Sequence, residues 1–218
     1  MKDWKGSGSI WKKIMKLFFD LDGTLIDSRL RLFNLFQELV PPSEMSFDEY
    51  WQLKRNKVNH ETILKQQFNY QSGEIDVFNV RWMELIEENN WLKLDMPFEG
   101  VKEHLASLKD RGHHLYLVTA RQFKDRAINQ ISNFGWFDLF DDYLVTEQKY
   151  DKADLIRPFL QPKEISWMVG DTGKDIQTGK LLNMKTVAVL TGFLSRQSLI
   201  NYAPDQIVSS LVEFDPER

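Results

Sequence analysis

Two aspartates stand two positions apart directly after an apolar run. The run from Met15 to Phe19 leads into Asp20 and Asp22, and Gly23 opens the turn that follows. Side chains two residues apart at a strand end project the same way, and the turn frees backbone N–H groups for an anion. One carboxylate can attack phosphorus, the other can move a proton, and a divalent cation can neutralise the crowded charge. The segment therefore predicts phosphoryl transfer, with a solvated turn followed by a helix cap as the alternative.

A second pair of acids follows another apolar run, Trp167 to Val169. Asp171 and Asp175 are four residues apart at an expected strand-to-helix turn, so they share one face. Two carboxylates at this spacing repel unless a cation lies near, and Mg²⁺ with a lysine would offset the repulsion. We interpret Asp171 as a metal ligand. For Asp175, capping of the helix N-terminus competes with a metal role.

Between the acidic segments lie a hydroxyl and two lysines that suit a phosphate. Thr119 ends an apolar run and Ala120 follows it, so the hydroxyl and a backbone N–H can hold a phosphate oxygen without adding charge. The alternative for Thr119 is an ordinary helix cap. Arg121 either reaches the substrate or faces solvent. A lysine is expected to offset the negative charge of the reacting groups, and Lys149 and Lys152 are both candidates.

The elements that must position these residues alternate between strand and helix from residue 97 onward. Short apolar strands are expected at 114–118, 143–145, 166–169 and 186–190, and helices at 101–110, 123–134, 153–159 and 175–182. Helical crossovers between short strands give a parallel sheet with helices on both faces. The fold class is therefore α/β with a doubly wound sheet, whose ligands bind beyond the carboxyl ends of the strands.

The segment from 29 to 96 differs, because its apolar residues recur at helical spacing. Helices are expected from 30 until the prolines at 41 and 42, from about Ser46, at 61–68 and at 75–88. This pattern predicts an all-helical domain, 29–96, inserted into a core domain formed by 14–28 and 97–218. Residues 1–13 are expected to be a flexible N-terminal extension.

Composition narrows the class of protein. The 218 residues are 42% hydrophobic, which is enough to bury a sizeable interior. A net charge of −4 argues against nucleic-acid binding through a broadly basic surface and favours a small anionic substrate. The chain contains no cysteine, so disulfides and thiolate metal sites are excluded. We expect a cytoplasmic protein that does not bind membranes, and the sequence leaves monomer and homodimer open.

Across residues 15–195 the order and spacing of these candidates resemble the four motifs of the haloacid dehalogenase superfamily, the aspartate-nucleophile phosphohydrolases. The matching residues are Asp20, Asp22, Thr119, Lys152, Asp171 and Asp175. Lys152 resembles the shorter form of the family's lysine motif and is preferred, because the prolines that would follow Lys149 in the longer form are missing.

The resemblance implies a mechanism. Asp20 attacks phosphorus to give an aspartyl-phosphate, while Asp22 protonates the leaving oxygen and then activates water. Mg²⁺ would be bound by Asp20, the backbone carbonyl of Asp22 and Asp171, and Asp175 would position the lysine or a metal-bound water. Phosphate would be bound by Asp20 and by the following residues: Gly23, Thr119, Ala120 and Lys152.

The place of the helical insertion, after the first motif, resembles the family's helical-cap subgroup, which includes phosphoglycolate phosphatases, pyrophosphatases and sugar phosphomutases. The expected function is a Mg²⁺-dependent phosphatase acting on a small phosphorylated metabolite. A sugar phosphomutase of the same fold and a phospho-accepting regulatory or binding protein are the alternatives. The basic residues Lys54, Arg55, Lys57 and His60 either meet a second anionic group of the substrate or form a solvated helix face.

Overall fold

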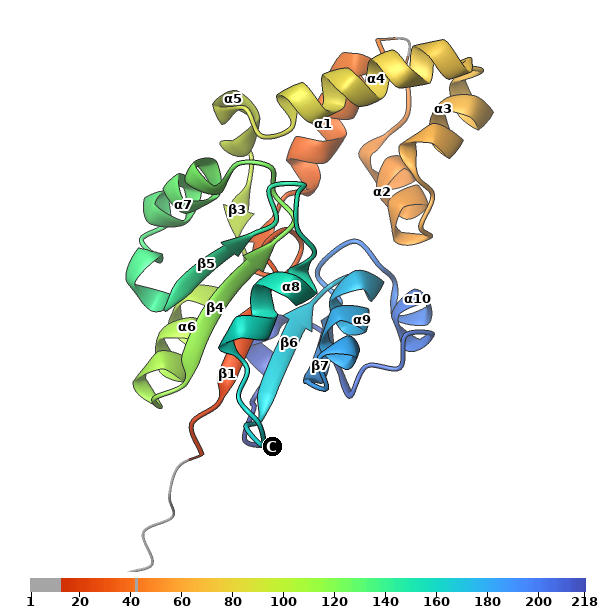
Figure 1. The fold of residues 1–218 in the computed structure, drawn as a ribbon. Coiled ribbons are helices and arrows are strands. Elements are labelled where there is room, and N and C mark those ends of the chain that lie inside the picture. The colour runs from red at the N-terminus through yellow and green to blue at the C-terminus, as the bar shows by residue number, and fades with distance from the viewer. Residues whose placement is uncertain (1–12, 42) are drawn as a thin grey trace, which may run out of the picture.

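A computed structural model describes residues 13–41 and 43–218 of the chain. The expected N-terminal extension therefore lies, except for Lys13, outside the described residues. The core is a sheet of six strands in the order β5-β4-β1-β6-β7-β8, and every neighbouring pair is parallel (Figure 1). The strands are β1 (Lys16–Phe19), β4 (His114–Thr119), β5 (Asp142–Val145), β6 (Ser166–Gly170), β7 (Lys185–Val189) and β8 (Gln206–Val208). The predicted fold class is confirmed.

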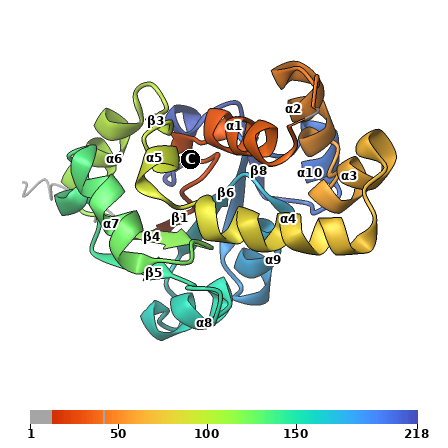
Figure 2. The ribbon, with the colours of Figure 1, turned by 90° about the horizontal axis from the view of Figure 1, so that it is seen from above.

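Helices cover both faces of this sheet because its strands are apolar on both sides. Side chains alternate along β1, so Leu17 and Phe19 pack in one cluster with α6 (Val101–Asp110) while Phe18 packs in another with α8 (Lys152–Ile156). Figure 2 shows these two helices on opposite sides of the sheet. The remaining helices of the core are α7 (Lys124–Asn133), α9 (Gly173–Leu181) and α10 (Arg196–Ile200).

The segment between Asp27 and Met96 is helical, as the apolar spacing predicts. Its helices are α1 (Arg29–Leu39), α2 (Phe47–Arg55), α3 (His60–Phe68), α4 (Ser72–Leu85) and α5 (Asn89–Leu92). The first four stand beyond the carboxyl ends of the strands and enclose a hydrophobic cluster of their own, with Phe36, Tyr50 and Phe78 at its centre (Figure 1). We call residues 29–92 the helical insert; the division into domains stays a prediction.

The chain enters and leaves the helical insert at one place. The two-residue strands β2 (Ile26–Asp27) and β3 (Met96–Pro97) pair antiparallel, with Ile26 opposite Pro97 and Asp27 opposite Met96. Neither strand is predicted from the sequence, since two residues give no periodic signal. Their pairing brings residues some 70 positions apart together at the edge of the core.

Local signals set several helix ends. Before α2, the Ser46 hydroxyl accepts a hydrogen bond from the Glu49 N–H (3.3 Å) and the Glu49 carboxylate accepts one from the Ser46 N–H (2.8 Å), which is a capping box. The helix expected at 153–159 divides into α8 and a 3₁₀ turn, Arg157–Phe159. Pro158 explains the division, because it has no N–H to continue the α-helical ladder. Within the described residues, none of the helices has the length and apolar character needed to cross a membrane.

Candidate active site

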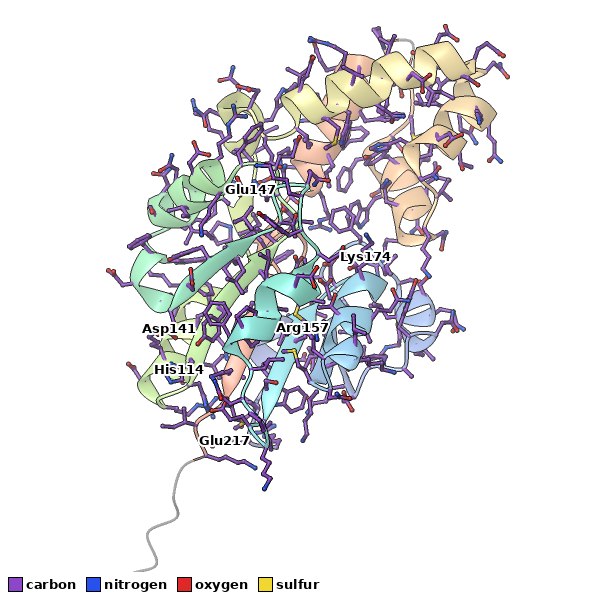
Figure 3. The ribbon with its side chains drawn as sticks, in the orientation of Figure 1. His114, Asp141, Glu147, Arg157, Lys174 and Glu217 are labelled. Carbon is purple, nitrogen blue, oxygen red and sulfur yellow. The ribbon has the colours of Figure 1, made fainter. Side chains whose placement is uncertain are left out.

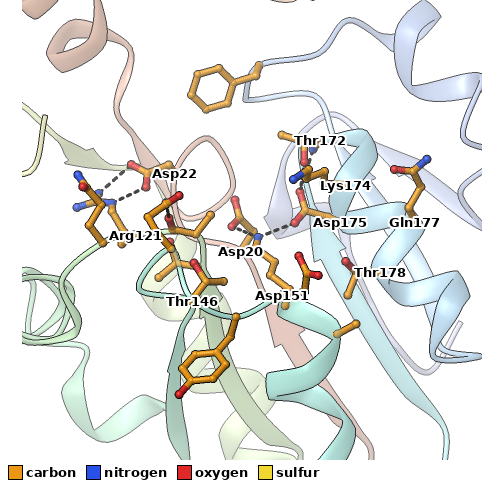
Figure 4. Close-up of a pocket in the computed structure, with 18 of the residues that line it drawn as sticks. Asp20, Asp22, Arg121, Thr146, Asp151, Thr172, Lys174, Asp175, Gln177 and Thr178 are labelled. Atoms are coloured by element: carbon orange, nitrogen blue, oxygen red, sulfur yellow. Dashed lines mark hydrogen bonds and ion pairs between the residues drawn. The ribbon is translucent and has the colours of Figure 1, made fainter. Parts of the chain in front are cut away.

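The polar residues that follow the strands converge at the carboxyl edge of the sheet. β1 lies between β4 and β6, so Asp20 after β1 comes next to Thr119 at the end of β4 and close to Asp171 after β6. The Asp20 N–H donates to the Val169 carbonyl at 2.9 Å, which fixes the backbone here. A cavity of about 850 Å³ opens above this edge and extends to α1 and α4 of the helical insert (Figure 4).

Asp20 lies at the floor of the cavity beside one buried cation. Lys152, at the first turn of α8, contacts the Asp20 carboxylate and donates to Asp175 Oδ1 at 2.6 Å. Burial raises the pKa of Asp20 to about 7 against the opposing effect of Lys152. Burial alone would lower the pKa of Lys152, but Asp175 and Asp20 raise it above its ordinary value. The lysine is therefore held as a cation next to the carboxylate expected to react.

Three buried carboxylates form a group that suits a divalent cation. One oxygen each from Asp20, Asp171 and Asp175 lies within 4.8 Å of the others. Burial, with the charges of Asp20 and Asp175, raises the pKa of Asp171 well above its ordinary value. Such crowding of acids is unfavourable without a positive charge, and carboxylate oxygens are the ligands that Mg²⁺ takes in proteins. The residues therefore fit a divalent metal.

The surrounding loops hold Asp171 and Asp175 in place. Asp171 Oδ2 accepts the Phe193 N–H at 2.6 Å, and a Cβ added to Gly192 would come within 1.9 Å of that oxygen. A Cβ added to Gly23, whose φ is +82°, would come within 2.6 Å of the same oxygen. Asp175 Oδ2 accepts the Thr172 hydroxyl at 2.6 Å and the Thr172 N–H at 3.1 Å. Asp175 therefore caps α9, as one of the two sequence interpretations predicts, and also pairs with Lys152; its metal role stays a prediction.

Two arginines hold Asp22. Figure 4 shows Asp22, paired with Arg121, on the side of Asp20 away from Asp175. Arg121 donates to both of its carboxylate oxygens, at 2.6 and 2.8 Å, and Arg31 of α1 also contacts it. Burial alone would raise the pKa of Asp22, but Arg121 and then Arg31 outweigh it and hold that pKa well below its ordinary range. Arg121 is therefore not a solvent-facing side chain; it is buried and binds Asp22.

The same arginines share a second carboxylate, Asp95, just before β3. Arg31 Nε donates to Asp95 Oδ1 at 2.9 Å, and Arg121 Nη2 lies 3.2 Å from Asp95 Oδ2. Gln130 of α7 donates to Asp95 at 2.9 Å and accepts from Arg121 at 3.1 Å. We call Asp22, Arg31, Asp95, Arg121 and Gln130 the arginine cluster. The cluster joins the helical insert to the core. Its contacts could not be predicted from the sequence, because no local motif marks Asp95 or Arg31.

Asp95→Asn is expected to destabilise the protein by roughly 3 kcal/mol or more, because it leaves two buried arginines short of one negative charge. The Asp95 side chain is fully buried, so solvent cannot compensate. The free energy of urea unfolding measures the effect. Glu61→Gln, which breaks the exposed Glu61–Lys65 pair of α3, is the matched control and should change stability by less than about 1 kcal/mol. Equal effects for the two variants would contradict a structural role for the arginine cluster.

The structure also places the other residues singled out in the sequence. Thr119 is buried and, like Ala120, lines the cavity. Lys149 is exposed and does not line it, whereas Lys152 does. The four basic residues of the insert, Lys54, Arg55, Lys57 and His60, do not line it either. Lys57 is exposed, as a solvated helix face predicts, and donates to the Tyr202 hydroxyl at 2.7 Å, whereas His60 is half-buried among aromatic rings.

Comparisons with known proteins agree with this architecture. The sequence model of the haloacid dehalogenase-like hydrolase family matches residues 17–189. The chain is 26% identical to pyrophosphatase PpaX of Bacillus mycoides, with 94% of this chain and 96% of the relative covered. It is 26% identical to a phosphoglycolate phosphatase of Aquifex aeolicus, with 84% and 88% covered. A solved haloacid dehalogenase-like family hydrolase of Streptococcus pneumoniae shares the fold, with a TM-score of 0.73, 24% identity, and 92% and 96% of the two chains covered.

Proposed function

Since the chain belongs to the haloacid dehalogenase-like hydrolase family and is an enzyme of that family, we propose that it is a phosphatase that hydrolyses a small phosphorylated metabolite through an aspartyl-phosphate on Asp20. The observation that carries the proposal is the position of Asp20. It ends a buried strand, touches the Lys152 ammonium, and lies between a second carboxylate, Asp22, and a pair of further acids.

The first chemical step is attack on phosphorus by an Asp20 oxygen. A bond forms between that oxygen and phosphorus while the bond from phosphorus to the ester oxygen breaks, and the leaving oxygen takes a proton from Asp22. Lys152 is placed to stabilise negative charge on the transferring phosphoryl group. The Thr119 hydroxyl and nearby backbone N–H groups suit its remaining oxygens.

The second step returns the enzyme to its starting state. Asp22, now a carboxylate, takes a proton from a water molecule whose oxygen attacks phosphorus, and the bond to Asp20 breaks to release inorganic phosphate. The contacts from Arg121 and Arg31 favour the ionised form of Asp22, which takes the proton from water in this step, and oppose the protonated form that the first step uses.

Asp20, Asp171 and Asp175 are the residues that would hold Mg²⁺, with the Asp22 carbonyl as a further ligand. The ion would supply positive charge that neutralises the crowded carboxylates and the phosphoryl oxygens. Lys152 contacts Asp20 and Asp175 from α8, and the Phe193 N–H donates to Asp171.

Mg²⁺ is expected to stabilise the protein against heat more strongly at high pH than at low pH. The pKa of Asp20 is raised to about 7 in the metal-free fold, above its pKa in the unfolded chain. The protonated side chain therefore contributes its full stabilisation below the unfolded-chain pKa, and this stabilisation is lost as the pH rises through 7. Metal binding requires the ionised form and releases that proton. At saturating Mg²⁺ we expect a rise in Tm of roughly 5 to 10 °C at about pH 8.5, and clearly less at about pH 5.5.

Thermal unfolding with Mg²⁺ or with chelator at the two pH values measures this effect. Asp171→Asn should abolish the Mg²⁺-dependent shift. Asp154→Asn, which removes an exposed acid of the same cavity outside the carboxylate group, should retain it. A shift of equal size at both pH values, or one that survives in Asp171→Asn, would contradict the proposed metal site.

The test of the proposed function is inorganic phosphate release from a panel of phosphorylated metabolites, with Mg²⁺ or with chelator. Metal-dependent release with many turnovers per enzyme supports a phosphatase. Transfer of the phosphoryl group to a second position of a sugar phosphate without free phosphate would instead support a phosphomutase.

A further inference from the structure

The position of Asp22 fixes where the departing half of the substrate lies. Under the proposed function, on which this inference rests, Asp22 gives its proton to the leaving oxygen and must come within hydrogen-bond reach of it. Figure 4 shows Asp22 on one side of Asp20 and Lys174 on the other. The leaving group therefore extends on the Asp22 side, toward α1 and the end of α4 in the helical insert.

The wall on that side is apolar. The helical insert contributes Leu32 from α1, and Met83 and Ile86 from α4 and the residue after it. Met83 is 39% exposed, so part of its side chain is available to a ligand in the cavity. Phe193 adds a ring from the core and is itself packed on Trp51 of α2, with the ring centroids 5.4 Å apart. This surface suits a hydrocarbon or a ring and offers no partner to a charge.

Arg31 is the one cation that the helical insert contributes to the described lining of the cavity, and each of its three nitrogens already has a partner. Its Nε donates to Asp95 (2.9 Å), its Nη1 donates to the Ile86 carbonyl (2.9 Å), and its Nη2 contacts Asp22. The side chain is only 3% exposed. A second anionic group on the substrate could reach this guanidinium only by displacing a carboxylate that already occupies it.

A buried acid adds negative charge to the same side. Glu87 lines the cavity, and its carboxylate accepts the N–H groups of Gln122 (2.7 Å) and Phe123 (3.2 Å). Of the other cations that line the cavity, Lys152 and Arg121 are buried against carboxylates, and one nitrogen of Arg121, the buried Nη1, has no hydrogen-bond partner. Arg157 near α8 and Lys174 on α9 are exposed, as Figure 3 shows. A carboxylate or second phosphate on the leaving group would thus meet apolar side chains, Glu87 and two buried arginines that already pair with carboxylates, and no exposed cation on this side.

We propose that the substrate is a phosphate monoester whose leaving group is uncharged and largely apolar. Phosphoglycolate and pyrophosphate, after which the two relatives are named, each carry a second anionic group. The chain is therefore expected to differ from both in substrate class although it shares their chemistry.

The first experiment compares esters that differ only in one negative charge. Values of kcat/KM are measured for phenyl phosphate and para-carboxyphenyl phosphate, and for 2-hydroxyethyl phosphate and phosphoglycolate, at saturating Mg²⁺. The ester with the uncharged leaving group should have the higher kcat/KM in each pair, by about tenfold or more. The dissociation constants of both members for Asp20→Asn with Mg²⁺ give the same comparison without turnover.

A new charge on the wall should shift this preference. Met83→Lys places an ammonium on α4 at the cavity and should raise kcat/KM for the carboxylate esters by roughly tenfold. The matched control is Val77→Lys, which adds the same charge to the same helix at a position that is 64% exposed and outside the cavity lining. That variant should keep the wild-type ratio.

The outcomes separate the inference from the proposed function. Preference for the carboxylate member in the wild-type protein would overturn the inference. Absence of phosphate release from every ester would sink the phosphatase proposal, while the two dissociation constants would still decide between charged and uncharged ligands.

Discussion

Replacing Asp20 by asparagine is expected to reduce phosphate release by roughly 10⁴-fold or more, because the amide cannot form the bond to phosphorus on which both steps depend. The change keeps the size of the side chain and removes one carboxylate next to Lys152 and Asp171. Steady-state rates with the best ester of the panel, at saturating Mg²⁺, measure the loss.

The intermediate itself offers a second measurement. Wild-type protein quenched in acid during turnover should carry phosphate in a form released by hydroxylamine, as an acyl phosphate is, and Asp20→Asn should carry none. Asp27→Asn is the control: it removes a nearby acid that pairs with Arg29, and it should label and turn over like the wild type. Full labelling of Asp20→Asn would assign the nucleophile to another residue.

Asp22→Asn is expected to lower kcat by roughly 10²–10⁴-fold for alkyl phosphates, because it removes the proton donor and the base for water. For para-nitrophenyl phosphate the rate of the first step should fall less, because nitrophenolate departs without a proton. A burst of nitrophenol equal to the enzyme concentration, followed by a slow rate, would then report trapped aspartyl-phosphate. Equal losses for the two esters without a burst would contradict the acid–base assignment.

Gln130→Ala provides a matched comparison for Asp22→Asn. Gln130 belongs to the arginine cluster but contacts Arg121 and Asp95, not Asp22. It should lower stability without changing the dependence of rate on the leaving group. A change in that dependence would show that the geometry of the cluster, rather than the acid itself, limits the chemical step.

The sequence was sufficient to predict the sheet and the residues at its carboxyl edge. Apolar runs marked β1, β4, β5, β6 and β7, and each candidate site residue stood directly after one of them or at the helix that follows. Because parallel strands end at one edge, sequence order alone brought Asp20, Thr119 and Asp171 together. The edge strand β8 was missed because Gln206–Val208 is only half-buried and gives no apolar run.

The arginine cluster could not be predicted in the same way. Arg121 contacts Asp22 across 99 residues and Arg31 contacts Asp95 across 64, so neither pair leaves a periodic or motif signal. The basic residues near Lys54 could not be assigned from their charge alone. Lys57 is exposed, as a solvated face predicts, but His60 packs among the aromatic rings of the insert, a contact that the sequence does not reveal.

The antiparallel pairing of β2 with β3 makes the helical insert a closed loop on the core. Its two ends are fixed by the pairs Ile26–Pro97 and Asp27–Met96, and the entropy of closing such a loop rises only with the logarithm of its length, about 0.6 kcal/mol for each doubling. Helices of other lengths and sequences can therefore replace the insert at little cost to the core. Side-chain contacts with the core restrict such exchange: a replacement lacking Arg31, for example, would leave Asp22 without its second arginine and Asp95 without one of its two arginines.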